Sequence, residues 1–265
     1  MIIGFVGTGN MGGALAIAAA KTGATLILNN RTPEKAEKLA GQLGCETASA
    51  QEIAKLCDYI FLGVKPQLMG DLLSDLAPTL QARKDPFTLV SMAAGLTMDT
   101  IRKMAGGNYP VIRMMPNTPV AVGCGVILYD TTENVTDEAL SGFCNAMSQA
   151  GLVDRLPEAL MDACSAVSGC GPAFVSMFLE ALADGGVACG LPRQKAVEYA
   201  AHTLLGTAQL LLETGKHPGQ LKDEVCSPGG STIEGVKALE QGGLRAASMQ
   251  AVKNAFLRTR QLSTP

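Results

Sequence analysis

The chain has 265 residues, of which 47% are hydrophobic and 17% are charged, and its formal net charge is −3. This composition is typical of a soluble globular protein with enough residues for one large domain or two smaller ones. The mild acidity argues against nucleic acid and anionic membranes as partners, because both attract basic surfaces.

Short apolar runs alternate with helical stretches through the first half of the chain. We expect strands at 2–7, 25–30, 59–64, 87–93 and 111–115, and helices at 33–43, 51–57, 67–82 and 97–105. This alternation predicts parallel strands joined by right-handed crossovers in a doubly wound sheet. Edge strands are expected at 125–130 and 151–157, around a helix at 136–149.

The β signals stop after residue 157. Helices are predicted at 158–168, 172–189, 192–214, 218–225, 231–241 and 243–262, separated by glycine or proline. We therefore expect an α/β domain over 1–157 and an all-α domain over 158–265. The helix at 172–189 is apolar nearly all round and has to be enclosed. This favours self-association, the alternative being tight packing within one chain.

The N-terminal segment 1–21 is apolar enough to suggest a signal peptide. It lacks a basic start and is interrupted by glycines, which favours a strand, a turn and a helix instead. No uninterrupted apolar run reaches the ~18 residues of a membrane span, so we expect no transmembrane segment.

The eight cysteines form no CxxC pair, and the chain has only two histidines. A metal site is therefore not expected. We interpret the cysteines as buried, reduced thiols of a cytoplasmic protein.

A GxGxxG motif, GTGNMG, occupies residues 7–12 between the first strand and an alanine-rich helix that starts near Asn10. Glycines in this context allow a tight turn and close approach of a pyrophosphate, which the N-terminus of the helix stabilises. The alternative is an ordinary glycine-rich turn. The residues predicted to bind a dinucleotide here are Gly7, Thr8, Gly9, Asn10, Met11 and Gly12.

The second strand ends in Asn-Asn-Arg-Thr, where an NAD site usually carries a carboxylate for the ribose 2′-hydroxyl. Amides, a hydroxyl and a guanidinium suit a 2′-phosphate instead, because Arg is a forked, charged donor. We therefore predict that Asn30, Arg31 and Thr32 bind NADP(H) in preference to NAD(H), although NADH could still be used. The alternative is a solvated turn whose arginine binds nothing.

Three later strands end in loops of small residues and prolines. Ligands lie outside the carboxyl ends of strands in a doubly wound sheet, so these loops should face the same crevice as the glycine turn. Ordinary turn chemistry is the alternative for each loop taken alone. The residues predicted to surround the nicotinamide are Val64, Lys65, Pro66, Ala93, Ala94 and Asn117.

The motifs GFVGTGNMG, GVKPQ, SMAAG, MPNTP, SGCGPAF and CSPGGSTIEG appear in this order along almost the whole chain. Together they closely resemble the pyrroline-5-carboxylate reductases, which catalyse the last step of proline biosynthesis. The resemblance implies reduction of L-1-pyrroline-5-carboxylate to L-proline by NADPH or NADH. It also implies a Rossmann-type doubly wound sheet followed by an all-α C-terminal dimerisation domain, in dimers that often assemble into decamers. Two departures are Cys170 for the frequent Ser and Phe174 for the frequent Tyr, and the second excludes a tyrosine hydroxyl at 174.

The SPGGST segment at 227–232 is the most specific of these motifs. Its glycines allow a sharp turn, and the helix expected from Ser231 offers unpaired N–H groups for a carboxylate. By resemblance, Thr232 lies near the ring nitrogen, where it would orient the imine or relay its proton. The alternative for this segment alone is a capped turn between helices. The predicted substrate-binding residues are Ser227, Gly230, Ser231 and Thr232, of which Thr232 is the predicted catalytic one.

Three other interpretations remain open. Glu180 and Asp184 share one face of the 172–189 helix and could be catalytic acids, although hydrogen-bonded or interface carboxylates are the favoured interpretation. A β-hydroxyacid dehydrogenase would place a lysine on that helix, which has none. A non-catalytic redox sensor would bind NADP without turnover.

Overall fold

The structure is a computed structural model, and it describes residues 1–262. Contacts group these residues into two compact units. The first unit is Met1–Cys170 together with the last turns of the C-terminal helix, and the second is Gly171–Asn254. The grouping therefore divides the chain after Cys170, whereas the boundary at 157/158 and the domains 1–157 and 158–265 stay predictions; residues 263–265 lie outside the described part.

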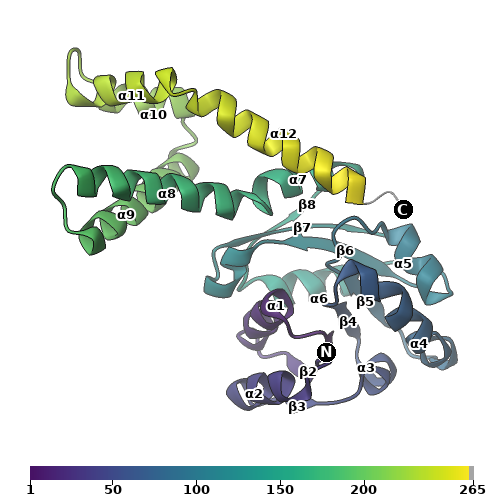
Figure 1. The fold of residues 1–265 in the computed structure, drawn as a ribbon. Coiled ribbons are helices and arrows are strands. Elements are labelled where there is room, and N and C mark those ends of the chain that lie inside the picture. Colours follow the sequence, from purple (N-terminus) through teal and green to yellow (C-terminus); the bar gives the residue numbers. More distant parts are fainter. Residues whose placement is uncertain (263–265) are drawn as a thin grey trace. The chain divides into compact units, whose positions relative to one another are not determined.

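The first unit is built on an eight-stranded sheet with the order β3-β2-β1-β4-β5-β6-β7-β8 (Figure 1). Its strands are β1 Ile2–Val6, β2 Thr25–Asn29, β3 Glu46–Thr47, β4 Tyr59–Leu62, β5 Thr88–Ser91, β6 Val111–Pro116, β7 Gly125–Thr131 and β8 Gly151–Arg155. The strands from β3 to β6 are parallel, as the alternation predicts.

The last two strands of this sheet reverse direction, which the strand–helix alternation of the earlier segments does not predict. β7 runs antiparallel to β6, and β8 runs parallel to β7. β7 is also not an edge strand, because β8 covers it; the other edge is the short β3, which the sequence did not indicate.

The helices of the first unit cover both faces of the sheet (Figure 1). They are α1 Asn10–Ala20, α2 Pro33–Leu43, α3 Ala50–Leu56, α4 Met69–Ala82, α5 Met98–Ala105, α6 Asp137–Met147 and α7 Glu158–Ser168, with short 3₁₀ helices η1 Pro66–Leu68 and η2 Thr118–Val122. Local signals set their ends: Ser49 and Glu52 form a reciprocal capping box at α3. Thr32 precedes Pro33 as the N-cap of α2, but its side chain makes no capping hydrogen bond.

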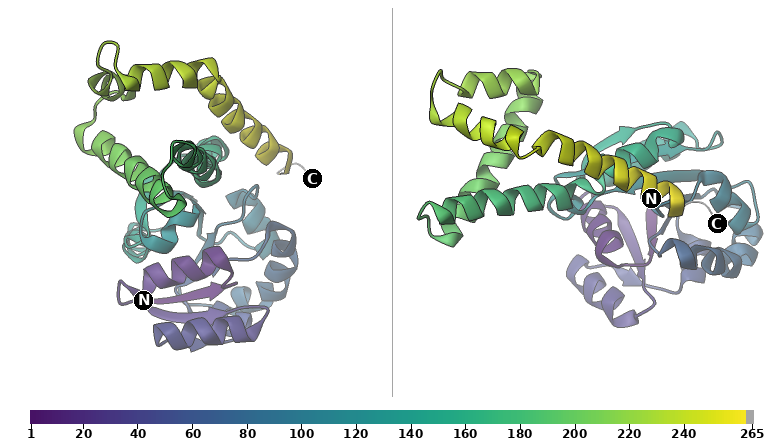
Figure 2. Two further views of the ribbon diagram at one scale, coloured as in Figure 1. Left: turned by 60° about the vertical axis from the view of Figure 1, so that its left-hand side comes forward. Right: turned by 45° about the horizontal axis from the view of Figure 1, so that its top comes forward.

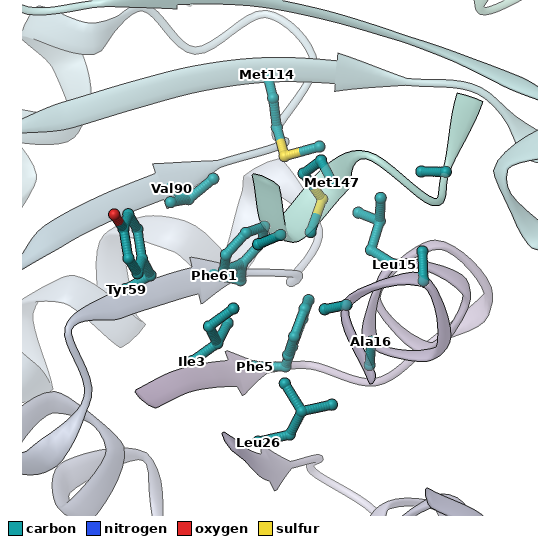
Figure 3. Close-up of a cluster of buried hydrophobic side chains, with 14 of the residues drawn as sticks. Ile3, Phe5, Leu15, Ala16, Leu26, Tyr59, Phe61, Val90, Met114 and Met147 are labelled. Atoms are coloured by element: carbon teal, nitrogen blue, oxygen red, sulfur yellow. The ribbon is translucent and has the colours of Figure 1, made fainter. Parts of the chain in front are cut away.

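Alternating side chains of the central strands fill two cores. On one face, Phe5 of β1 packs on Phe61 of β4 with ring centroids 4.6 Å apart, in a cluster that also contains α1 and α6 residues (Figure 3). On the other face, Val6 and Leu62 pack against α3, α4 and α5. Burial on both faces is what a parallel sheet requires, and it holds the carboxyl ends of the strands in fixed register.

The second unit contains only helices: α8 Gly171–Ala188, α9 Arg193–Thr214, α10 Pro218–Val225, α11 Ser231–Gln241 and the greater part of α12 Leu244–Leu262. α8 and α9 pack side by side (green in Figure 2) through Ala183, Ala196 and Ala200. α8 begins at Gly171, so Pro172 is its second residue rather than its first.

The apolar surface of α8 is not enclosed within the single chain. Val175 is 52% exposed and Met177 is 70% exposed, and Leu205 and Leu212 of α9 are also exposed. Glu158–Ala188 is long and apolar enough to cross a membrane by length and composition alone, with 11% of its apolar window buried. An exposed apolar surface of this kind is what a subunit interface leaves open when one protomer is viewed alone.

Candidate active site

The glycine turn after β1 leaves no room for a side chain at its first and third glycines. Gly7 has φ +102°, and its N–H donates to the Asn29 carbonyl oxygen at 2.9 Å. A Cβ on Gly12 would lie 2.1 Å from the Gly7 carbonyl oxygen, whereas a Cβ on Gly9 would meet nothing within 4 Å. The first and third glycines are therefore required by packing, and the second faces open space that a ligand can approach.

The turn leads into a helix start that is suited to an anion. α1 begins at Asn10 after Gly9, has no side-chain cap, and carries no acidic residue in its first turn. Thr8 is 7% exposed, and its Oγ1 is buried without a hydrogen-bond partner among the described residues. Free helix N–H groups, an orphaned hydroxyl and an open Gly9 fit a dinucleotide pyrophosphate.

The turn after β2 holds its asparagines and leaves its arginine exposed. Asn29 Nδ2 donates to the Ala48 carbonyl oxygen at 2.8 Å, and Asn30 Nδ2 donates to the Thr32 carbonyl oxygen at 3.1 Å. Arg31 is exposed, and within residues 1–262 no carboxylate forms an ion pair with it. A fixed turn with an available guanidinium fits a 2′-phosphate, and the roles of Asn30, Arg31 and Thr32 stay predictions.

The three loops of small residues lie at the same edge of the sheet. They follow β4, β5 and β6, which run parallel to β1, so they share the carboxyl edge of the sheet with the glycine turn, and a common crevice stays a prediction. Their contacts with a cofactor stay predictions. Of the predicted residues, Ala93 and Asn117 are buried, Val64 and Pro66 are half-buried, and Lys65 and Ala94 are exposed.

Asn117 is already engaged by the protein. Its Oδ1 accepts from the Val126 N–H at 2.8 Å, and its Nδ2 donates to the Ser168 carbonyl oxygen at 3.0 Å. The residue is 8% exposed. No local sequence pattern indicates the link to Ser168, which lies 51 positions further along the chain.

The SPGGST turn of the second unit has the predicted local geometry. Gly229 has φ +67°, the Gly230 N–H donates to the Ser227 carbonyl oxygen at 3.1 Å, and α11 begins at Ser231. The helix has no side-chain cap. Ser227 and Ser231 are exposed and Thr232 is half-buried. The turn thus presents hydroxyls and helix N–H groups, and their binding roles stay predictions.

The carboxylates of α8 differ in their surroundings. Asp184 forms an ion pair with Arg193 Nη1 at 2.5 Å, and Glu180 is exposed. The ion pair favours the structural interpretation of Asp184 over a role as a catalytic acid.

The expectation of buried cysteines is mostly wrong. All eight thiols are free, but only Cys57 is buried, and Cys124 and Cys189 are exposed. Burial raises the pKa of the Cys57 thiol to about 12, so it stays neutral. Among residues 1–262, no group of three or more His, Cys, Asp or Glu side chains is placed to hold a metal ion.

If a cavity alone decided where the ligand binds, the site would lie at the opposite edge of the sheet. A cavity of about 860 Å³ is lined by Met1, Tyr59, Thr88 and Pro110, which lie at or next to the amino ends of strands. Ligands of doubly wound sheets lie at the carboxyl ends. The chemistry of the glycine turn, at the carboxyl end of β1, therefore favours that edge for the predicted cofactor site.

β6 carries a buried arginine that the motifs of the sequence do not indicate. Arg113 of β6 is 3% exposed, and its guanidinium pairs with Glu158 at 3.1 Å and Asp162 at 3.3 Å, both on α7. A charged residue inside the otherwise apolar run VIRMMP was the available signal, because buried charges require partners.

Comparison with known proteins identifies the family. Over 266 residues, covering 98% of both chains, the protein is 40% identical to the pyrroline-5-carboxylate reductase of Escherichia coli K12. The chain belongs to the pyrroline-5-carboxylate reductase family. Within it, residues 158–262 match the family description "Pyrroline-5-carboxylate reductase dimerisation", and residues 2–95 match "NADP oxidoreductase coenzyme F420-dependent".

Solved structures of this reductase family agree over the whole chain. The Plasmodium falciparum pyrroline carboxylate reductase, crystallised with NADP bound, covers 100% of the chain at 30% identity and a TM-score of 0.87, with 98% of its own chain matched. The Coxiella burnetii enzyme covers 99% at 30% identity and a TM-score of 0.90, again with 98% of its own chain matched. The chain is thus an NADP-dependent oxidoreductase with a Rossmann-like N-terminal domain and a helical dimerisation domain.

Proposed function

We propose that the chain reduces L-1-pyrroline-5-carboxylate to L-proline, the final step of proline biosynthesis, with NADPH preferred and NADH accepted as reductant. The observation that carries this proposal is the SPGGST turn, which leaves the start of α11 uncapped beside exposed hydroxyls. The substrate is a small anion with one polar ring atom. Such a turn can bind its carboxylate without a bulky arginine.

Each part of the turn has a separate proposed role. The N–H groups at the start of α11, near Gly230 and Ser231, bind the carboxylate together with the Ser227 hydroxyl. The Thr232 hydroxyl orients the imine nitrogen or passes a proton to it. A protonated imine is already electrophilic, so the residues chiefly hold the ring and exclude water. This explains why the segment 227–232 contains no histidine or lysine.

The cofactor-binding residues hold the reductant at defined points. The turn at residues 7–12 and the start of α1 bind the pyrophosphate, and Arg31, with Asn30 and Thr32, binds the 2′-phosphate. NADPH supplies the hydride when bound. The loops carrying Val64, Lys65, Pro66, Ala93, Ala94 and Asn117 shape the nicotinamide pocket.

We also infer that the chain forms homodimers that assemble into decamers, acts in the cytoplasm, and needs no metal. The exposed apolar side chains of α8 and α9 and the dimerisation match support self-association. Light scattering of the purified protein measures the assembly size, and a monomer at micromolar concentration would refute the proposed self-association.

Dialysis against a chelator tests whether the protein needs a metal. A lasting loss of activity would contradict the proposal.

The decisive test is NADPH oxidation by the purified chain with pyrroline-5-carboxylate as substrate. We expect rapid loss of NADPH absorbance with the five-membered imine and a slower reaction with piperideine-6-carboxylate. A 3-hydroxyacid with NADP in the reverse direction should give no reduction, which a hydroxyacid dehydrogenase would show. Nucleotide binding without turnover of any imine would instead indicate a redox sensor.

A further inference from the structure

We propose that Asn117 is a positioning residue: it fixes Ser168–Cys170, the residues directly before α8, to the sheet through the Ser168 carbonyl. The inference rests on the proposed function for its kinetic consequence and on hydrogen bonds of the first unit for its physical basis. The two bonds of the Asn117 amide, to Val126 and Ser168, are both shorter than 3.1 Å. They join the end of β6, the start of β7 and the end of α7 at one buried side chain.

α7 is also fixed to the sheet at its other end. The Glu158 carboxylate accepts from Arg113 at 3.1 Å and from the Met98 N–H at 2.8 Å, and the Glu158 N–H donates to Asp130 at 2.7 Å. The first turn of α7 is therefore held by β6, β7 and α5. Arg113 lies in β6 and Asn117 follows directly after it, so one strand anchors both ends of the helix.

Asn117 attaches the C-terminal end of α7 to the sheet by a single hydrogen bond, whereas several bonds hold the first turn of the helix. The Ser168 hydroxyl donates to Cys164, and the N–H groups of Gly169 and Cys170 donate to Ser165, all within the helix itself. Within the described residues, these bonds hold the helix end together but do not attach it to the sheet. The last carbonyls of a helix lack partners in the helix, and Asn117 satisfies one of them.

The position of this segment matters for the proposed reaction. Cys170 is followed immediately by α8, whose first residues belong to the SGCGPAF motif. Asn117 itself belongs to the loop after β6, at the strand ends that carry the cofactor-binding residues. A displacement of about 1 Å can cost roughly 100-fold in rate when it moves groups that align the reactants. Asn117 thus acts on catalysis through another segment, without a contact of its own to the reacting atoms.

Asn117→Asp is the sharpest test because it alters one of the two bonds. The retained oxygen still accepts from Val126, while the new oxygen faces the Ser168 carbonyl and repels it. Asn117→Ser is the second variant, because its short hydroxyl cannot reach Ser168 and introduces no charge. Asn134→Asp is the matched control: Asn134 Nδ2 donates to the Asn108 carbonyl oxygen at 2.9 Å, and its Oδ1 accepts from Arg102 and Thr132.

We expect both Asn117 variants to lower kcat/KM for the imine by roughly 10- to 100-fold. The Kd for NADPH, measured by fluorescence, should stay within about twofold, because Val126 and Ser168 already engage both polar atoms of the Asn117 amide. Amide hydrogen exchange of residues 168–174 should accelerate by roughly fivefold or more in these variants and not in Asn134→Asp.

Two results would overturn the inference. One is an NADPH Kd that rises as much as kcat/KM falls, which would make Asn117 a direct cofactor ligand. The other is wild-type exchange at residues 168–174 in both Asn117 variants. A wild-type protein that leaves the imine untouched refutes the proposed function instead, and the hydrogen-exchange comparison still decides the role of Asn117.

Discussion

Gly7 and Gly63 directly follow the adjacent strands β1 and β4, and their backbones are in close contact. A Cβ on Gly63 would lie 2.3 Å from the Gly7 carbonyl oxygen, and a Cβ on Gly7 would lie 2.6 Å from the Gly63 carbonyl oxygen. Neither distance is possible for real atoms in contact, so both positions require glycine. The glycine turn is thus shaped by the neighbouring strand as much as by its own sequence.

Gly63→Ala should therefore destabilise the first unit and weaken NADPH binding together. The added methyl group has to displace backbone rather than a flexible side chain, which costs about 1–3 kcal/mol of the free energy of unfolding. Urea denaturation and NADPH titration measure the two effects. Gly70→Ala in α4 is the control, since its Cβ would meet nothing within 4 Å. Equal stability of the two variants would show that the turn has room to adjust.

Much of the fold follows from the sequence because strand–helix alternation leaves few topologies. The strand–helix alternation does not give the direction of β7. The length of the connection between β6 and β7 does. Only residues 117–124 separate β6 from β7. A parallel crossover needs about a dozen or more residues, so this connection could only return antiparallel. β3 has two residues and is held by pairing with β2, which no local pattern reports.

The candidate site was predictable only where its residues are neighbours in the chain. The glycine turn, the Asn30–Thr32 turn and the SPGGST turn are local motifs whose chemistry can be read from composition. The link from Asn117 to Ser168 spans 51 positions, and the pairing of Arg113 with Glu158 spans 45. Such contacts depend on how α7 packs on the sheet, which is a property of the folded chain.

Arg31→Ala should separate the two reduced cofactors. Loss of a charged hydrogen bond to the 2′-phosphate should weaken NADPH by about 1–3 kcal/mol and leave NADH nearly unchanged. Titration of the free enzyme with each cofactor measures this difference. Lys84→Ala, an exposed cation beside the amino ends of the strands, is the control for net charge. An equal loss for both cofactors would remove Arg31 from 2′-phosphate recognition.

Thr232→Ala should lower kcat/KM for the imine by roughly 10- to 150-fold, which is the value of one hydrogen bond to a charged group. Thr232→Ser keeps the hydroxyl and should retain most of the activity. Steady-state kinetics at saturating NADPH measure both. A loss beyond about 10⁴-fold in the alanine variant would instead indicate obligatory acid catalysis by this residue.

Ser227→Ala should act on substrate binding rather than on turnover. Its hydroxyl is assigned to the carboxylate, which is bound equally in the ground state and the transition state. The KM for pyrroline-5-carboxylate should rise by roughly tenfold while kcat changes little. The KM for NADPH is the internal control. An unchanged KM for the imine would remove Ser227 from carboxylate binding.

Tyr59→Phe should reduce the loss of stability at alkaline pH. Burial, with smaller effects from Asp58, Glu138 and Cys144, raises the pKa of the Tyr59 phenol from 10.0 to about 12. Between these values the unfolded chain has released the proton while the folded protein keeps it, so the free energy of unfolding falls as pH rises. The wild type should lose about 2 kcal/mol more than the variant between about pH 8 and pH 11.5.

Urea denaturation at both pH values measures this difference. The variant also loses the hydrogen bond from the Tyr59 hydroxyl to the Ala139 carbonyl oxygen, which is 2.6 Å long. That loss lowers stability by about 1 kcal/mol at both pH values and cancels in the comparison. Tyr199→Phe, at a position 53% exposed, is the control. Parallel pH profiles for the wild type and Tyr59→Phe would contradict the assignment.

Arg113→Met should be among the more destabilising substitutions in the first unit. It fills the same apolar space but leaves Glu158 and Asp162 without their cation. Removing one partner of a fully buried ion pair costs about 3–5 kcal/mol, because a charge is left desolvated. Both carboxylates are 26% exposed and can partly hydrate, so we expect about 2–4 kcal/mol.

The matched control is Arg155→Ala, which removes an arginine that is 57% exposed and lies 3.6 Å from Asp130. Exposed pairs of this kind contribute at most about 1 kcal/mol, so urea denaturation should separate the two variants clearly. If Arg113→Met were as stable as Arg155→Ala, hydration of the carboxylates would be sufficient to replace the guanidinium. The start of α7 at Glu158 would then be held by the bonds to Met98 and Asp130.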